Sequence, residues 1–135
     1  MNFSRLNSYA PPMLSVLRVV TALVYLEHGT QKLLNFPASA RAGGAGLNLF
    51  SMFGAAGLIE CVAGVLLVLG LFSRAAAFIA AGEMAVAYWM VHIRGGFFPV
   101  NNGGDAAIMF CFVFLYVVLA GPGPWSIDAL RSRKP

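Results

Sequence analysis

The stretch Leu23-Val-Tyr-Leu-Glu-His-Gly-Thr-Gln-Lys-Leu-Leu34 begins inside an apolar run and ends with a glutamate, a histidine, a glutamine and a lysine within six residues. The run starts at Met13 and is long enough to cross a bilayer, which takes about 20 residues. Glu27 and His28 therefore lie inside or at the edge of the hydrocarbon, where an ionisable group costs at least about 2.5 kcal/mol. Such a cost is met only where other groups pair with these side chains or where they carry a function.

The composition indicates an integral membrane protein. Hydrophobic residues make up 59% of the 135 residues and charged residues 10%, with a mean hydropathy of +0.78. Soluble domains are about 45–50% apolar and about 25% charged. The length allows one domain. The net charge of +4 is not the signature of a nucleic-acid partner, because the basic residues lie at predicted helix ends and in the tail.

The apolar runs predict an all-α, four-helix membrane bundle with its spans at residues 13–34, 49–71, 75–93 and 106–120. Ser73-Arg74 forms a very short turn, so the second and third helices are predicted to be antiparallel neighbours. Asp105 is expected to cap the fourth helix, and Ser126 a short surface helix through Leu130. A cleaved signal peptide is disfavoured, because the polar segment after the first run is too long for a cleavage region.

The distribution of Lys and Arg predicts the orientation. Six lie in the N-terminal part, the turn between helices two and three, and the tail: Arg5, Arg18, Arg74, Arg131, Arg133 and Lys134. Three lie toward the other side: Lys32, Arg41 and Arg94. Cytoplasmic loops carry the excess of positive charge. We therefore expect a multi-pass protein of the plasma (inner) membrane with both termini in the cytoplasm.

This topology gathers the polar residues toward the outer side, and we take them as lining a candidate pocket: Glu27, His28, Lys32, Glu60, Glu83, His92, Asn102 and Asp105. Only Arg18, near the inner edge, is charged in the inner half. Glu60 shares a helix face with Gly57 and Gly64, and small residues let a neighbouring backbone come close. Glu60 is therefore expected to face protein rather than lipid.

Each candidate also has a structural interpretation. His28 and Lys32 could be a pair whose polar ends reach toward the interface, and Glu83 could be a protonated packing residue. Glu83 and His92 are nine residues apart, about 900° around a helix, and are expected on opposite faces. Cys61 and Cys111 could form a redox pair, although buried single cysteines are usually small packing residues.

Four sequence blocks resemble the DoxX family in order and spacing, and they span nearly the whole chain: His28-Gly29-x-x-Lys32-Leu33, Glu60-x-x-x-Gly64-x-x-Leu67-x-x-Gly70-Leu71-x-x-Arg74, Asn102-Gly-Gly-Asp105 and Gly121-Pro-Gly-Pro-Trp-Ser-Ile-Asp128. The resemblance implies a small four-helix membrane protein. One branch of the family, DoxD-like, is associated with thiosulfate:quinone oxidoreductase, and others are linked to redox systems. Asp105 stands where the family usually has glutamate, and the extra domain of some thiosulfate-oxidising relatives is missing.

These observations favour a membrane redox component, either a quinone-interacting subunit or the membrane partner of an oxidoreductase complex. Glu60 and His28 are the candidate catalytic residues, as proton donors beside an apolar slot. The aromatic residues expected to flank a quinone ring are Tyr88, Trp89, Phe97 and Phe98. The sequence contains no metal constellation, haem motif or nucleotide fingerprint. Electrons would then come from a soluble or membrane partner enzyme or from a bound quinol.

Two other classes of function stay open. The first is a non-enzymatic assembly or chaperone-like membrane protein, in which buried charges lock the packing of the helices. The second is a pathway for small solutes or protons, which is disfavoured because the inner half lacks polar residues. Co-extraction of a small molecule would separate the binding hypothesis from the assembly hypothesis.

Overall fold

The computed structural model describes residues 3–38 and 49–132. Within these ranges the chain is helical and has no strand, which confirms the all-α prediction. The elements are α1 (Phe3–Asn7), α2 (Ala10–Leu34), α3 (Met52–Leu69), α4 (Ser73–Met90), the 3-10 helix η1 (His92–Gly95), α5 (Pro99–Asn102), α6 (Asp105–Ala120) and α7 (Ile127–Ser132).

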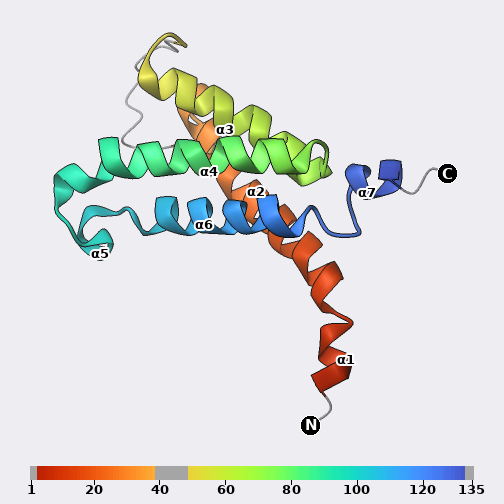
Figure 1. The fold of residues 1–135 in the computed structure, drawn as a ribbon. Helices are drawn as coiled ribbons and strands as arrows, with labels where there is room; N and C mark the ends of the chain where they lie inside the picture. Colours follow the sequence, from red (N-terminus) through yellow and green to blue (C-terminus); the bar gives the residue numbers. More distant parts are fainter. Residues whose placement is uncertain (1–2, 39–48, 133–135) are drawn as a thin grey trace.

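Two helix pairs build the bundle, α2 with α3 and α4 with α6, and these pairs make the most extensive contacts. The short turn at Gly70 to Phe72 joins the pairs, so α3 and α4 are antiparallel, as predicted. Ser73 and Arg74, which were predicted to form this turn, are instead the first two residues of α4. From this turn α3 and α4 diverge, while α4 and α6 stay side by side and α2 crosses behind them (Figure 1). The ends of α3 and α4 that lie away from this turn are consequently separated, and the candidate site lies between them.

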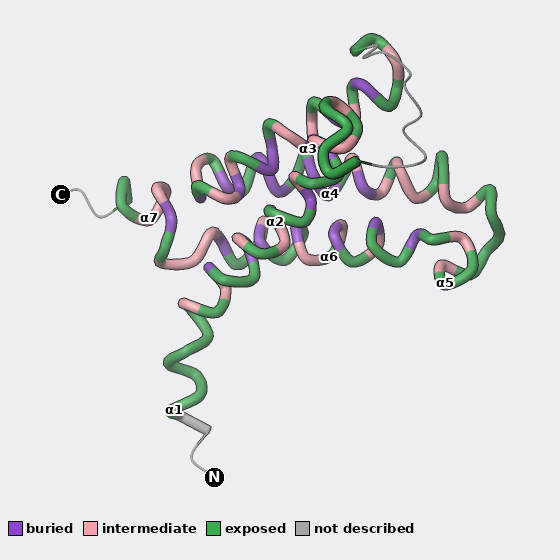
Figure 2. The backbone as a smooth tube through the Cα atoms, turned by 180° about the vertical axis from the view of Figure 1, so that it is seen from behind, coloured by how far each residue is buried: buried purple, intermediate pink, exposed green. Residues whose placement is uncertain are grey.

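Within residues 3–38 and 49–132, three helical segments are long and apolar enough to cross a membrane: Ala10–Leu34, Met52–Leu69 and Ser73–Gly95. The fourth, α6, is apolar but has 16 residues, about 24 Å at 1.5 Å per residue. The outward surface of the bundle is apolar as well, since Val62, Phe78 and Phe112 are 55%, 65% and 67% exposed in the isolated chain. Figure 2 shows exposed positions running along every helix. Lipid is the solvent that such a surface requires.

The four long helices start one to three residues from the predicted positions, at 10, 52, 73 and 105 rather than 13, 49, 75 and 106. The first long helix begins at Ala10 rather than at 13, because Pro11 and Pro12 occupy the first turn, where a missing N–H costs nothing. Gly104, not Asp105, occupies the N-cap position of α6. Asp105 lies in the first turn instead, where a negative charge interacts favourably with the helix dipole. Ser126 caps α7 as predicted, accepting the N–H of Ala129 at 3.1 Å.

The close packing of α2 on α3 depends on glycine. A Cβ on Gly29 would lie 2.8 Å from the backbone nitrogen of Cys61, and one on Gly57 would lie 3.0 Å from the Cβ of Lys32. A Cβ on Gly64 would lie 3.1 Å from that of Leu26. Close approach of membrane helices along small residues is a common source of their packing energy. The predicted small-residue face of α3 therefore meets protein, and it brings Glu60 against α2.

Arg18 closes the opposite end of the bundle. It is fully buried, although the sequence placed it near the membrane edge. Its guanidinium donates to the carbonyl oxygens of Leu67, Val68, Pro122 and Trp125. Arginine suits this position because its planar fork presents several donors at once. The side chain thus ties α2 to the end of α3 and to the segment after α6.

Asp128 fastens α7 to the start of α4. Its carboxylate accepts the backbone N–H groups of Phe72 at 3.0 Å and Ser73 at 2.8 Å. Burial acts to raise the pKa of this carboxyl, but the hydrogen bonds from Ser73 and Phe72 and the charge of Arg131 outweigh it and hold the pKa below its ordinary value. An acid at a helix N-terminus satisfies donors that the helix itself leaves free.

Asp128→Asn keeps one acceptor oxygen but removes the charge, and it is expected to lower stability at neutral pH by about 0.3–1 kcal/mol, the usual range for a charge at a helix N-terminus. Because the folded pKa is depressed, the contribution of Asp128 is fully present above the ordinary aspartate pKa of about 3.9 and is lost as the pH falls through the folded value. Unfolding temperatures in detergent at neutral and acidic pH measure this. The difference between wild type and Asp128→Asn should shrink in acid. An unchanged difference would contradict the capping role.

Candidate functional site

The wedge between the diverging ends of α3 and α4 contains a cavity of about 620 Å³. This volume lies within the range of pockets that hold small organic ligands. Helix α2 forms its floor, and α6 contributes one wall through Phe110. The polar side chains lining it are those of His28, Lys32, Glu60, Glu83 and His92. Most of the remaining lining is apolar, including Met52, Phe53, Ile59, Phe78, Ile79, Met84, Met90 and Val91.

An ion pair between α2 and α3 forms part of the cavity lining. Lys32 Nζ lies 2.5 Å from Glu60 Oε1. The Lys32 side chain is 27% exposed and the Glu60 side chain is fully buried. The pair explains how α3 carries a carboxylate within an apolar helix. It also removes the interpretation of Lys32 as a residue that only reaches for the interface.

The second oxygen of Glu60 lacks a partner. Glu60 Oε2 is buried and makes no hydrogen bond to any described residue. Leaving a buried polar atom unpaired costs about 1–3 kcal/mol, and more where the group is charged. Glu60 also lines the cavity. A hydrogen-bond donor inside the cavity would complete this carboxylate.

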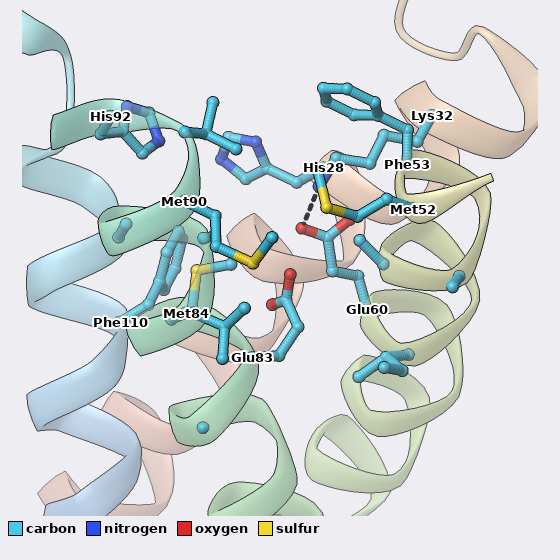
Figure 3. A pocket seen from close by; sticks show the side chains of 18 of the residues that line it. His28, Lys32, Met52, Phe53, Glu60, Glu83, Met84, Met90, His92 and Phe110 are labelled. Carbon is cyan, nitrogen blue, oxygen red and sulfur yellow. Dashed lines mark hydrogen bonds and ion pairs between the residues drawn. The ribbon is translucent and has the colours of Figure 1, made fainter. Parts of the chain in front are cut away.

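Glu83 supplies a second carboxyl group from α4. Tyr25, fully buried on α2, donates its hydroxyl to Glu83 Oε2 at 3.2 Å. The tyrosine ring packs edge-on against Phe110 and Phe114 of α6, which holds its hydroxyl in place. In Figure 3 the carboxyl groups of Glu83 and Glu60 point toward the same space from opposite sides. Tyr25 was not among the predicted site residues, because one tyrosine in an apolar helix resembles a packing residue.

Two histidines, His28 and His92, also line the cavity. His28 contacts the edge of Phe110, with ring centroids 5.7 Å apart. His92 Nδ1 lies 3.2 Å from the carbonyl oxygen of Asn102. The sequence put Glu83 and His92 on opposite faces, yet both line the cavity. The reason is that α4 ends at Met90 and η1 turns His92 back.

Three predicted residues lie outside this cavity. Asp105 is exposed at the start of α6, and Glu27 lines a separate small depression of about 70 Å³ beside Gln31 and Pro37. Asn102 holds the loop instead, donating to the Gly96 carbonyl at 2.8 Å. The predicted convergence of Asp105 with His28, Lys32 and Glu60 is therefore wrong. A residue at the first turn of an exposed helix end points to the surface as readily as to a neighbour.

The four aromatic residues that were expected to flank a quinone ring lie outside this cavity. Trp89, Phe97 and Phe98 are 66%, 75% and 63% exposed, and Tyr88 donates to the Phe97 carbonyl. None of these four lines the cavity. The aromatic side chains at the cavity are those of Phe53, Phe78 and Phe110. A sequence cannot distinguish them from the aromatic residues that lie near a membrane surface. Both cysteines, Cys61 and Cys111, are free thiols.

A helical bundle with an apolar outer surface, and with a largely apolar cavity at one end that contains buried carboxyl groups, defines a small integral membrane protein. More narrowly, the chain belongs to the DoxX family, whose model matches residues 13–93. An uncharacterized protein of Haemophilus influenzae is 44% identical over 134 residues, covering 97% of this chain and 99% of that protein. An uncharacterized membrane protein of Mycobacterium tuberculosis is 26% identical over 143 residues, covering 96% and 87%. Among solved structures, none matches this chain significantly.

Proposed function

We propose that this protein is a membrane redox component that binds a quinone in the cavity between α3 and α4. It would act as a quinone-interacting subunit or as the membrane partner of an oxidoreductase. The observation that carries the proposal is the buried carboxylate of Glu60, with one oxygen unpaired in an otherwise largely apolar cavity. An ionisable group at such a place in a membrane helix is a functional candidate by default.

The donor set fits this class of ligand. Apolar and aromatic walls, here Phe53, Phe78 and Phe110, suit a planar ring. The ammonium of Lys32 suits a quinone carbonyl, and the free oxygen of Glu60 suits a quinol hydroxyl. When bound, a quinone supplies reversible uptake of two electrons and two protons. The electrons would pass between the ligand and a partner enzyme.

Three residues of the chain would orient the ligand and transfer its protons. Glu60, held by Lys32 at 2.5 Å, is fixed and can orient a donor at its free oxygen. Glu83 has a neutral partner, the hydroxyl of Tyr25, and so can hold or release a proton without breaking an ion pair. His28, exposed near the mouth, can exchange protons with water. These three residues line the same cavity, so in this proposal they would carry protons between the ligand and water.

A second candidate function is favoured by one of the same contacts. The pair of Lys32 and Glu60 joins α2 to α3, and this is what a protein with a purely assembling role would need. Buried ion pairs can specify packing without adding stability. A pathway through the membrane has less support, because Arg18 and the segment after α6 fill the other end of the bundle.

Purification tests the proposal directly. The protein is extracted in a mild detergent, and the lipid fraction is analysed by chromatography for menaquinone and ubiquinone. We expect quinone to accompany wild type at close to one molecule per chain and to be depleted in Glu60→Leu. An Arg94→Gln variant, changed at an exposed residue outside the cavity, should retain it. Quinone at the level of an unrelated membrane protein purified in parallel would reject the proposal.

The orientation is part of the proposal and predicts a reporter pattern. Fusions at Arg41 and Arg94 should report the outer side, and a fusion at Arg74 the cytoplasm. The loop that contains Arg41 lies outside the described residues. Enzymatic reporters active on one side of the membrane only make the measurement. An inner location for Arg94 would place the cavity mouth at the cytoplasmic face and overturn the proposed outward opening.

A further inference from the structure

One glycine of the described helices contacts no neighbouring helix. At the helical glycines Gly29, Gly57 and Gly64, atoms of a neighbouring helix lie within about 3 Å of the position that a Cβ would take. Gly82, in the middle of α4, is different, because a Cβ there would meet no described atom within 4 Å. Glycine inside a helix costs about 1 kcal/mol relative to alanine. At Gly82 no helix contact compensates for this cost.

The position of Gly82 relates it to the cavity. It lines the cavity, is exposed at the side of the bundle, and directly precedes Glu83. Phe78 and Val86, four residues before and after it, share its helix face. They are 65% and 54% exposed and also line the cavity. Gly82 therefore leaves a gap between the apolar side chains of Phe78 and Val86 on the surface of α4 that faces the bilayer.

The facing edge on α3 has the same character. Met52 and Phe53 line the cavity and are 53% and 59% exposed. The polar groups lie deeper, since Glu60 is fully buried and Glu83 half-buried. Figure 3 shows the carboxyl groups between α3 and α4, with the helices standing apart on either side. From the bilayer inward, the cavity thus changes from apolar to charged.

We infer that the cavity is filled sideways from the bilayer, across Gly82, and that its ligand has a polar ring at Glu60 and Glu83 and a long apolar tail that remains between α3 and α4. This rests on the proposed function and narrows it to quinones with a lipid tail, as opposed to short, water-soluble ones. The tail would lie along Phe78 and Val86, where glycine lets it approach the α4 backbone. A side chain at residue 82 would occupy that path.

The test uses two quinones with the same naphthoquinone ring. Phylloquinone has a phytyl tail, and dimethylnaphthoquinone has a methyl group in its place. Binding is measured on the full chain in lipid nanodiscs, with protein-free discs used to express each concentration within the membrane. We expect phylloquinone to bind at least about tenfold more tightly than dimethylnaphthoquinone, ~1.4 kcal/mol.

Variants of α4 locate the entrance. Gly82→Leu should weaken phylloquinone binding by at least about tenfold, while the unfolding temperature stays near that of wild type because the new side chain meets open space. Ala75→Leu is the matched control, since Ala75 is exposed on the same helix and does not line the cavity. It should bind as wild type does. Equal binding of phylloquinone by wild type and Gly82→Leu overturns the inference.

A labelling measurement on wild type does not depend on any variant. A phylloquinone analogue with a photoreactive group on its tail should label the α4 peptide containing Phe78 and Val86. Labelling confined to the loop 92–104 at the outer mouth would overturn sideways entry. Equal affinity for the two quinones would overturn the role of the tail and leave the proposed function standing. Failure of both quinones to bind wild type would reject the proposed function itself.

Discussion

Arg18→Leu is expected to destabilise the folded chain by at least about 3 kcal/mol. Hydrogen bonds to a charged group contribute about 1.5–3 kcal/mol each, and Arg18 donates to four carbonyl groups from a fully buried position. Leucine would leave those carbonyls unpaired at the junction of α2, α3 and the segment after α6. The unfolding temperature in detergent should fall, and limited proteolysis should cut that C-terminal segment sooner.

Lysine at the same position should recover little of this loss. Its ammonium is a single point of charge and cannot reach carbonyls of both α3 and the C-terminal segment as a planar fork does. Arg5→Leu is the control, because Arg5 is exposed in α1. It should change the unfolding temperature by no more than a typical surface substitution. Arg18→Leu with wild-type stability would show that these hydrogen bonds contribute nothing to the fold.

Lys32→Met is expected to produce the second large effect, a destabilisation of about 3–5 kcal/mol, because it leaves the Glu60 carboxylate buried without its cation. The double variant Lys32→Met with Glu60→Leu should recover most of that stability, since hydrophobic replacements of a whole buried pair are often tolerated. Unfolding temperatures of the two single variants, the double variant and wild type form a complete cycle.

The same four proteins separate the two candidate functions. If the cavity binds quinone, the double variant should fold and yet lose the co-purifying quinone, because the free oxygen of Glu60 has been removed. Glu60→Gln keeps the shape of the side chain. It should lower the amount of co-purifying quinone strongly and the unfolding temperature only slightly. A stable double variant that also retains wild-type activity in the cell would instead identify Glu60 as a tolerated packing residue.

The sequence predicted correctly those features that depend on residues close together in the chain. Composition and the lengths of the apolar runs sufficed for an all-α membrane bundle. The short break between the second and third apolar runs sufficed for antiparallel neighbours, although the turn lies at Gly70 to Phe72 and not at Ser73-Arg74. The face containing Gly57, Glu60 and Gly64 also follows from helical spacing alone. Each of these inferences uses only the period of a helix and the need to satisfy backbone groups in lipid.

The partners of the polar side chains were not predictable in the same way. Helix spacing places Glu60 on a protein-facing side but does not say that Lys32 reaches it and Tyr25 reaches Glu83. It put Arg18 near an edge, whereas the return of the chain after α6 buries it. It also placed Asp105 in the site, whereas this residue is exposed at the start of α6. These outcomes depend on how far and in which direction whole helices diverge.

Gly82 shows the same division most clearly. In the sequence it is one more glycine in an apolar helix, like Gly57 and Gly64. By itself the sequence determined that small residues would bring helices together, and at those two positions they do. Only the tertiary structure decided that no helix packs on Gly82, because α3 diverges from α4 beyond their shared turn and leaves open space beside it.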